Sequence, residues 1–380
     1  MNPLLQLITY GQSYWLDNLT RGMIKHGELQ HRVAKQGLRG VTSNPAIFHK
    51  AITGSDDYDA HIQQLVSEGC ELHEIYERLV VTDVQDACTI LRSVYDASEG
   101  TDGFVSLEVS PHLAHDTVAT MQEVRRLYHA VDRPNVMIKI PGTPAGLPAI
   151  EEMLYEGINI NITLLFAIKD YEAVAHAYIR ALQRHLDEGK PLHTLASVAS
   201  FFLSRIDVLV DKLLEQHVRS AHTSGEMPQQ LMGRAAIANA KLAYQSFQRI
   251  FSGPTWQELE AKGARVQRPL WASTSTKNPR YSDVCYVEPL IGPHTVNTMP
   301  DETIDAFVDH GVLVENAIVT ELDEAHQVMR QLAEIGIDFD AVTEQLQHEG
   351  MQKFIEPFDA LMQALKDKKQ QALRLHKTAH

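Results

Sequence analysis

The sequence predicts a (β/α)8 barrel, in which eight parallel strands alternate with helices and close into a cylinder. Short apolar strand patterns alternate with helical patterns along the 380 residues, and this alternation is typical of a parallel sheet. Eight such units in one chain favour a closed barrel. An open doubly wound sheet is the alternative, but no Gly-x-Gly-x-x-Gly turn follows the first strand.

The predicted strands are short apolar or alternating runs, most of them bounded by Gly, Pro or polar residues. They comprise residues 14–16, 38–42, 105–109, 136–140, 158–162, 194–199, 269–272 and 284–287. Residues 148–155 and 171–186 show helical periodicity. Pro300 is followed by two acidic residues, which indicates the start of a helix.

The segments 45–104 and 206–267 are too long for one helix and a loop, so we expect additional helices in both. Residues 354–369 predict an amphipathic helix that packs on the outside of the barrel or across one of its mouths. The basic end, residues 366–377, is interpreted as a solvated tail. We therefore expect a single barrel domain over residues 1–380 with helical insertions at about 45–104 and 206–267.

Composition restricts the classes of function. The net charge of −15 argues against nucleic acid as the main ligand, although a local cluster of donors can still bind a small anion. Cys70, Cys88 and Cys285 are odd in number and far apart, which favours a reducing compartment. The first ten residues lack a secretory pattern. No apolar run approaches the ~18 residues of a membrane span, so we expect a cytoplasmic protein without a membrane partner.

One predicted strand contains a lysine. Val136, Ile138 and Ile140 share a face that suits packing against helices, so Lys139 would point into the barrel near its C-terminal end. Barrel enzymes carry their chemistry at that end. Burial disfavours the charged form of an amine, and a neutral amine can form an imine with a carbonyl. The alternative is a lysine that reaches solvent or pairs with a carboxylate for structural reasons.

Other strands also end in polar residues. Asp17 follows the first strand and Glu108 ends the third, but a helix N-cap would explain Asp17 and a structural ion pair would explain Glu108. Asn44 precedes a proline, as it would in an ordinary turn. Asn161 and Thr163 share a face with Asn159.

Buried polar groups need partners, so this face predicts a polar wall inside the barrel. Ser200 carries a hydroxyl toward the end of the sixth strand. Together these residues suit a compact polar substrate such as a sugar, held around an imine.

Two segments could bind the anionic end of such a substrate. Arg205 follows the sixth strand, and the run from Trp271 to Lys277 brings four hydroxyls, Ser273 among them, and a cation to the end of the seventh. The arginine fork and hydroxyl donors match phosphate, and late strands of barrels often hold it. An ordinary polar loop is the alternative for the Ser/Thr run. A metal centre is not expected, because His112 and His115 have no acidic partner in a ligand pattern.

Nine stretches of the sequence resemble transaldolases, and they cover nearly the whole chain. They are SYWLDNLTR (13–21), GVTSNPAIF (40–48), VSLEVSP (105–111), VMIKIPGT (136–143), EGININITLLF (156–166), SVASFFLSRID (197–207), RPLWASTSTKNP (268–279), HTVNTMP (294–300) and MQKFIEPFDALMQAL (351–365). The length and the 206–267 insertion are similar to the longer bacterial subgroup of the family.

The resemblance implies a barrel enzyme that works through a lysine Schiff base, without a metal or an organic cofactor. Lys139 matches the Schiff-base lysine, and Asp17 matches the acid/base aspartate that serves cleavage of the C3–C4 bond. Glu108 matches the glutamate that moves protons through a water during imine formation and hydrolysis, and Thr163 would hold that water.

The resemblance also implies the substrates. Such an enzyme transfers a dihydroxyacetone unit from sedoheptulose 7-phosphate to glyceraldehyde 3-phosphate, giving erythrose 4-phosphate and fructose 6-phosphate in the pentose phosphate pathway. The residues expected to bind these sugar phosphates are Asn44, Asn161 and Ser200 for the hydroxyls, Phe202 as a wall, and Arg205 for phosphate. The inserted helices are compatible with a homodimer.

The sequence departs from the family pattern at the seventh strand. Shorter members carry Ala-Ser-Phe-Arg-Asn there, whereas this chain keeps Ser273 but has Ser275 at the position of the arginine, with Lys277 two residues later. We predict that Ser273 and Lys277 share the phosphate with Arg205. A Schiff-base aldolase that releases free dihydroxyacetone, and a non-catalytic sugar-phosphate binding barrel, remain alternatives from the sequence.

Overall fold

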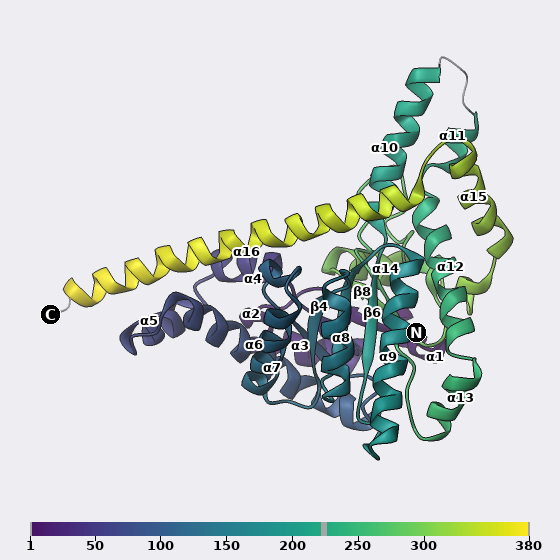
Figure 1. Ribbon diagram of the computed structural model, residues 1–380. Helices are drawn as coiled ribbons and strands as arrows, with labels where there is room; N and C mark the ends of the chain where they lie inside the picture. Colours follow the sequence, from purple (N-terminus) through teal and green to yellow (C-terminus); the bar gives the residue numbers. More distant parts are fainter. Residues whose placement is uncertain (1, 222–225, 379–380) are drawn as a thin grey trace.

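A computed structural model describes residues 2–221 and 226–378, and its centre is a closed barrel of eight parallel strands (Figure 1). The strands follow one another around the barrel in sequence order, and β8 pairs with β1 to close it. This confirms the predicted fold class. The strands are β1 Gln12–Leu16, β2 Gly40–Thr42, β3 Phe104–Glu108, β4 Val136–Pro141, β5 Ile160–Leu165, β6 Ser197–Phe202, β7 Arg268–Ala272 and β8 Thr295–Met299.

Two predicted strands were wrong in position. The sixth strand begins at Ser197 rather than at residue 194, and the eighth is Thr295–Met299 rather than residues 284–287. Residues 284–287 form turns, and they are apolar because they pack in the interior, where the Tyr286 hydroxyl donates to Asp207 Oδ2 at 2.8 Å. The eighth strand of the structure contains polar residues, which can be buried because their side chains form hydrogen bonds inside the protein. For example, Asn297 Nδ2 donates to the Tyr286 carbonyl at 3.1 Å.

Helices cover the outside of the barrel. They are α1 Pro3–Thr9, α2 Arg21–Lys25, α3 Glu28–His31, α4 Pro45–Gly54, α5 Asp59–Ser67, α6 Leu72–Ala97, α7 Thr117–Val131, α8 Gly146–Tyr155, α9 Ile168–Asp187, α10 Ser204–Ala221, α11 Glu226–Leu231, α12 Ala235–Ile250, α13 Pro254–Ala261, α14 Asp301–His310, α15 Leu322–Glu334 and α16 Phe339–Thr378, with a π-helical turn η1 Arg32–Gln36 and short 3-10 turns η2 Pro111–Leu113, η3 Glu288–Leu290 and η4 Ala317–Val319. The predicted helices at 148–155 and 171–186 correspond to α8 and α9, and the predicted start at Pro300 is the N-cap of α14. The segment 45–104 contains α4, α5 and α6, and the described part of 206–267 contains α10 to α13.

The alternation of side chains along β4 explains the position of the lysine. Val136, Ile138 and Ile140 are fully buried, whereas Met137 and Lys139 lie on the other face of the strand. In the register of the sheet, Lys139 lies beside Glu108 of β3 and Asn161 of β5. Polar residues from three neighbouring strands therefore meet near the C-terminal end of the barrel.

The C-terminal helix α16 is longer than predicted and begins at Phe339, well before residue 354. Figure 1 shows that α16 (yellow) runs across one end of the barrel and projects beyond it beside α5. In the part that the structure describes, the predicted solvated tail is a continuation of α16 that is only partly solvated: Lys366 and Arg374 are exposed, whereas Lys368 and Lys369 contact neighbouring segments. Lys368 pairs with Asp59, and Lys369 Nζ donates to the Cys70 carbonyl at 2.9 Å, because α5 and the loop after it supply acceptors there. The side chains of residues 375–377 lie outside the described part.

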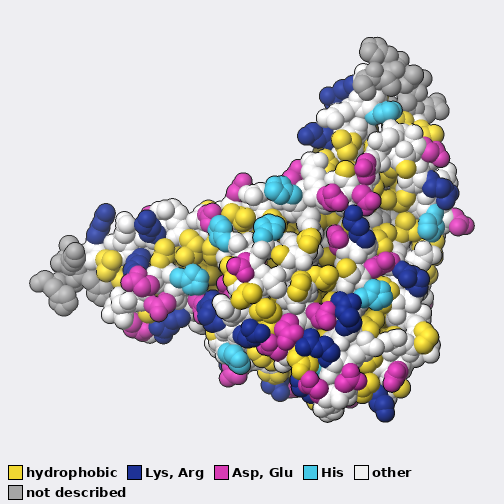
Figure 2. Space-filling view, in the orientation of Figure 1, with side chains coloured by type: hydrophobic (Ala, Val, Ile, Leu, Met, Phe, Trp, Pro, Cys, Tyr) yellow, Lys and Arg dark blue, Asp and Glu magenta, His cyan; other side chains and the backbone are white. Residues whose placement is uncertain are grey.

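The surface carries charges of both signs. On the face drawn in Figure 2, Lys and Arg side chains are interspersed with Asp and Glu side chains. None of the described helices is long and apolar enough to cross a membrane.

Candidate active site

The Lys139 amine is buried among polar groups near the C-terminal end of the barrel. Its Nζ atom is 3.6 Å from Glu108 Oε2 and donates a hydrogen bond of 3.4 Å to the Ser43 carbonyl. Only 7% of the lysine side chain and 4% of the glutamate side chain are exposed. An amine and a carboxylate are therefore held together, away from bulk water, where burial strengthens their effect on each other.

The carboxyl group of Glu108 has a perturbed pKa. Burial raises its pKa, the charge of Lys139 opposes that rise, and the nearby Asp17 charge adds to it. Its Oε2 atom has no hydrogen-bond partner among the described residues. A carboxyl group with a raised pKa, whose Oε2 meets the Lys139 amine but makes no hydrogen bond, can act as a general acid or base.

Asp17 lies directly after β1, close to the same amine. Thr42 Oγ1 donates to Asp17 Oδ1 at 2.8 Å. Burial raises the pKa of Asp17, whereas the charges of Lys139 and Lys277 lower it. The N-cap alternative for Asp17 is wrong, because Thr20 caps the following helix by accepting a hydrogen bond from the backbone of Met23. The Asp17 carboxylate is therefore not used to cap the helix, and it lies within electrostatic reach of the lysine.

The predicted polar wall is present around Asn161. Asn161 Nδ2 donates to Ser106 Oγ at 3.0 Å, and Ser200 Oγ donates to Asn161 Oδ1 at 2.7 Å. All three side chains are buried. The Thr163 hydroxyl is also buried and has no partner among the described residues, so it can bind a water or a substrate group. Asn159 serves the backbone instead, because its Oδ1 accepts from the Ala196 N–H at 2.9 Å.

Asn44 has a structural role that the sequence left open. It is the N-cap of α4, and its Oδ1 accepts from the Ile47 N–H at 3.0 Å. The Nδ2 group takes no part in this cap. The helix therefore fixes the orientation of the Asn44 amide, one residue after the carbonyl that Lys139 contacts.

The residues expected to bind phosphate lie on two neighbouring segments. Arg205 is in the first turn of α10, where its Nη1 is buried without a hydrogen-bond partner in the described part of the chain and its Cζ lies 5.6 Å from the ring centre of Phe202. Burial lowers the pKa of Arg205. Ser273 has a positive φ of 57° and brings its Oγ to 2.9 Å from Ser204 Oγ, so the end of β7 meets the start of α10.

Lys277 is linked less directly to Arg205 and Ser273. Its side chain is exposed and donates to Ser275. Its charge acts on Asp17 and lowers the pKa of that group. The structure therefore brings Ser273 next to the residue before Arg205, and it places Lys277 within electrostatic reach of Asp17.

Four residues of the site were not singled out from the sequence. Ser106 lies two positions before Glu108, so the two-residue period of the strand could have placed it on the same face. Thr42 and Ser43 lie at the end of β2 in the stretch that precedes Asn44. The ring centre of Phe354 lies 5.7 Å from Lys139 Nζ. No sequence signal connects this α16 residue with β4.

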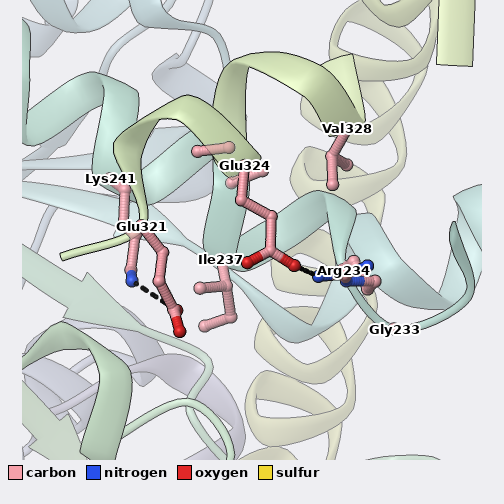
Figure 3. A pocket seen from close by; sticks show the side chains of 9 residues that line it. Gly233, Arg234, Ile237, Lys241, Glu321, Glu324 and Val328 are labelled. Atoms are coloured by element: carbon pink, nitrogen blue, oxygen red, sulfur yellow. Dashed lines mark hydrogen bonds and ion pairs between the residues drawn. The ribbon is translucent and has the colours of Figure 1, made fainter. Parts of the chain in front are cut away.

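Two other cavities offer no comparable chemistry. A cavity of about 200 Å³ lies between α12 and α15. Arg234 pairs with Glu324 there, and Lys241 pairs with Glu321 (Figure 3). A second cavity, of about 400 Å³, is lined by residues from the first positions of several strands, at the opposite end of the barrel from Lys139. Arg268 in that cavity pairs with Asp102 at 3.0 Å. Arg234, Lys241 and Arg268 are therefore already paired with carboxylates.

Comparisons with known proteins agree with the geometry. Residues 14–365 match the family model described as transaldolase/fructose-6-phosphate aldolase. The chain is 51% identical over 373 residues to "Transaldolase 2" of a Nostoc species, and the match covers 97% of this chain and 98% of the relative. It is 48% identical to a transaldolase of Trichodesmium erythraeum, covering 97% of each, and 44% identical to one of Thiobacillus denitrificans, covering 95% of this chain and 99% of the relative. The chain belongs to the transaldolase/fructose-6-phosphate aldolase family.

Proposed function

We propose that this protein is a transaldolase, which transfers a dihydroxyacetone unit between sugar phosphates through an imine on Lys139. The observation that carries the proposal is the buried amine of Lys139, 3.6 Å from the Glu108 carboxylate at the C-terminal end of the barrel, in a chain of this family. Lysine amines in such surroundings act as nucleophiles toward carbonyl groups.

The first step forms the imine. Lys139 Nζ attacks the C2 carbonyl of a ketose phosphate, and the resulting carbinolamine loses water to give a protonated imine. Glu108 exchanges the protons of this step through a water that the unpartnered Thr163 hydroxyl binds. The raised pKa of Glu108 suits this role, because a group that titrates closer to neutral pH can both take up and release a proton.

The second step breaks the carbon chain. Asp17 accepts the proton of the C4 hydroxyl, the C3–C4 bond breaks, and its electron pair moves into the imine to give an enamine. The aldehyde leaves while three carbons stay on Lys139. The enamine then attacks the carbonyl of an acceptor aldose phosphate, Asp17 returns the proton, and water releases the new ketose phosphate.

The remaining site residues bind the sugar phosphate. The amides of Asn44 and Asn161 and the Ser200 hydroxyl hold the hydroxyls of the three-carbon unit, and Phe202 forms a wall. Arg205 binds the phosphate together with Ser273 and Lys277. The buried, unpartnered Nη1 of Arg205 supports this role, since a buried donor without an acceptor is costly. The donor is sedoheptulose 7-phosphate, the acceptor is glyceraldehyde 3-phosphate, and the setting is the pentose phosphate pathway of the cytoplasm.

An assay of the transfer reaction tests this proposal. The purified protein is incubated with sedoheptulose 7-phosphate and glyceraldehyde 3-phosphate, and both fructose 6-phosphate and erythrose 4-phosphate are expected to appear. Lys139→Met is expected to abolish the reaction, whereas the matched change at the exposed Lys169, Lys169→Met, is expected to leave it intact. Rapid release of free dihydroxyacetone without any acceptor would instead identify an aldolase.

A further inference from the structure

Helix α16 contributes one face to the mouth of the barrel. Gln347 Nε2 donates to the Gly142 carbonyl at 3.2 Å and lies 3.5 Å from the Leu164 carbonyl, so it ties the helix to the ends of β4 and β5. Gly350 follows Gln347 by three residues, and Phe354 follows Gly350 by four, which places all three on the same side of the helix. We call these three residues the roof of the site.

The roof reaches from the proposed phosphate end to the lysine. A Cβ atom added at Gly350 would lie 3.6 Å from Arg205 Nη1. The ring of Phe354, which is only 6% exposed, lies 5.7 Å from Lys139 Nζ. Four residues of helix separate the two positions by about 6 Å along the axis.

The glycine in the roof is better explained by space than by backbone conformation. Glycine destabilises a helix interior relative to alanine, and Gly350 is not among the glycines with positive φ. A Cβ at this position would come within 3.0 Å of Leu164 Cδ2, in addition to its approach to Arg205. The absent side chain thus leaves room directly beside a buried guanidinium N–H that has no acceptor among the described residues.

The phenylalanine in the roof faces a centre that becomes positively charged. The faces of aromatic rings attract cations, and the attraction is greater where water is excluded. A protonated imine on Lys139 would be such a cation. The next aromatic residue on the same helix, Phe358, faces Tyr76 and His112 instead, with ring centres 5.4 and 5.7 Å away.

We propose that the roof selects the substrate: Gly350 keeps free the space in which the phosphate reaches Arg205, and Phe354 stabilises the protonated imine on Lys139. This inference rests on the proposed transaldolase function. It assigns α16 a role in recognition, beyond covering the barrel.

Gly350→Ala tests the first half of the proposal, with Gly54→Ala as the control because no atom lies within 4 Å of a Cβ added at Gly54. The KM for fructose 6-phosphate is expected to rise at least about tenfold in Gly350→Ala, because a hydrogen bond to a charged group is lost. The KM for unphosphorylated fructose and the melting temperature should change little. An unchanged KM for fructose 6-phosphate, or an equal rise for both sugars, would overturn this role.

Phe354→Leu tests the second half, with Phe358→Leu as a control of equal burial on the same helix. The fraction of protein trapped as an imine by borohydride at saturating fructose 6-phosphate is expected to fall several-fold in Phe354→Leu only. Equal trapping in both variants would refute the role of Phe354. Failure of the wild-type protein to catalyse transfer would count against the proposed function, whereas an active wild-type protein with indistinguishable variants would count against the roof alone.

Discussion

Glu108→Gln separates proton transfer from the other tasks of the site. The substitution keeps the shape of the side chain and removes a negative charge 3.6 Å from Lys139 Nζ. At an effective dielectric constant of about 20, unit charges at this distance attract each other by about 5 kcal/mol. The variant loses this attraction and the group that moves protons, but it keeps the Lys139 amine that attacks the carbonyl.

The expected effect on rate follows from the lost proton transfer. General acid–base catalysis contributes about 10²- to 10⁴-fold, which corresponds to about 3–5 kcal/mol of barrier. We expect imine formation with fructose 6-phosphate to slow by that factor in Glu108→Gln. Because Asp17 serves the later cleavage step, Asp17→Asn should still form an imine but retain all six carbons on Lys139.

Rapid-quench trapping with borohydride measures both expectations, since mass spectrometry distinguishes three-carbon from six-carbon adducts. Glu123→Gln is a suitable control, because the Glu123 carboxyl group also has a pKa raised by burial but accepts a hydrogen bond from the Ser110 N–H outside the barrel mouth. If Glu108→Gln forms the adduct within about threefold of the wild-type rate, far less than general acid–base catalysis provides, the proton-transfer role of Glu108 is refuted.

Three further predictions concern stability and phosphate binding. Asp83→Ala leaves the buried Arg21 without its carboxylate, 2.8 Å away in the native protein, and should lower the free energy of unfolding in urea by about 3–5 kcal/mol. The control Asp57→Ala, which breaks the more exposed pair with Lys25, should lower it by no more than about 1 kcal/mol. Equal losses in the two variants would contradict the argument. Burial raises the pKa of Asp207 to about 7, from an ordinary value of 3.8, so the native state binds this proton more tightly than the unfolded state. The stability from this group is therefore present below pH 4 and is lost as pH rises through 7, by at most about 1.4 kcal/mol per pH unit; Asp207→Asn should flatten that slope, and an unchanged slope would refute the assignment. Lys277→Ala should raise the KM for fructose 6-phosphate by up to about tenfold, and an unchanged KM would place Lys277 outside the phosphate site.

The sequence predicted the barrel and most of its strands because each strand is a local pattern of two-residue period. The orientation of Lys139 followed from its three branched neighbours in β4 for the same reason. The prediction of the eighth strand was wrong because it relied on a run of apolar residues. Val284, Tyr286 and Val287 are apolar or aromatic residues buried outside the strand, whereas Asn297 in β8 is polar and buried because it finds a hydrogen-bond partner inside the protein.

Contacts between distant segments could not be read from the sequence. Phe354 lies far from Lys139 along the chain, and no local periodicity determines where α16 crosses the barrel. The unpartnered atoms of Thr163 and Arg205 also became visible only once their surroundings were known. Sequence patterns thus predicted which residues end the strands, and three-dimensional packing determined which of them lack a partner.

Trapping of the covalent intermediate tests the central claim most directly. The protein is incubated with fructose 6-phosphate in the absence of an acceptor, reduced with borohydride, digested and mapped by mass spectrometry. The account predicts a three-carbon adduct on Lys139 and none on Lys241, the other lysine that is almost fully buried in the described structure. A folded protein without an adduct on Lys139, or with the adduct on another lysine, would contradict it.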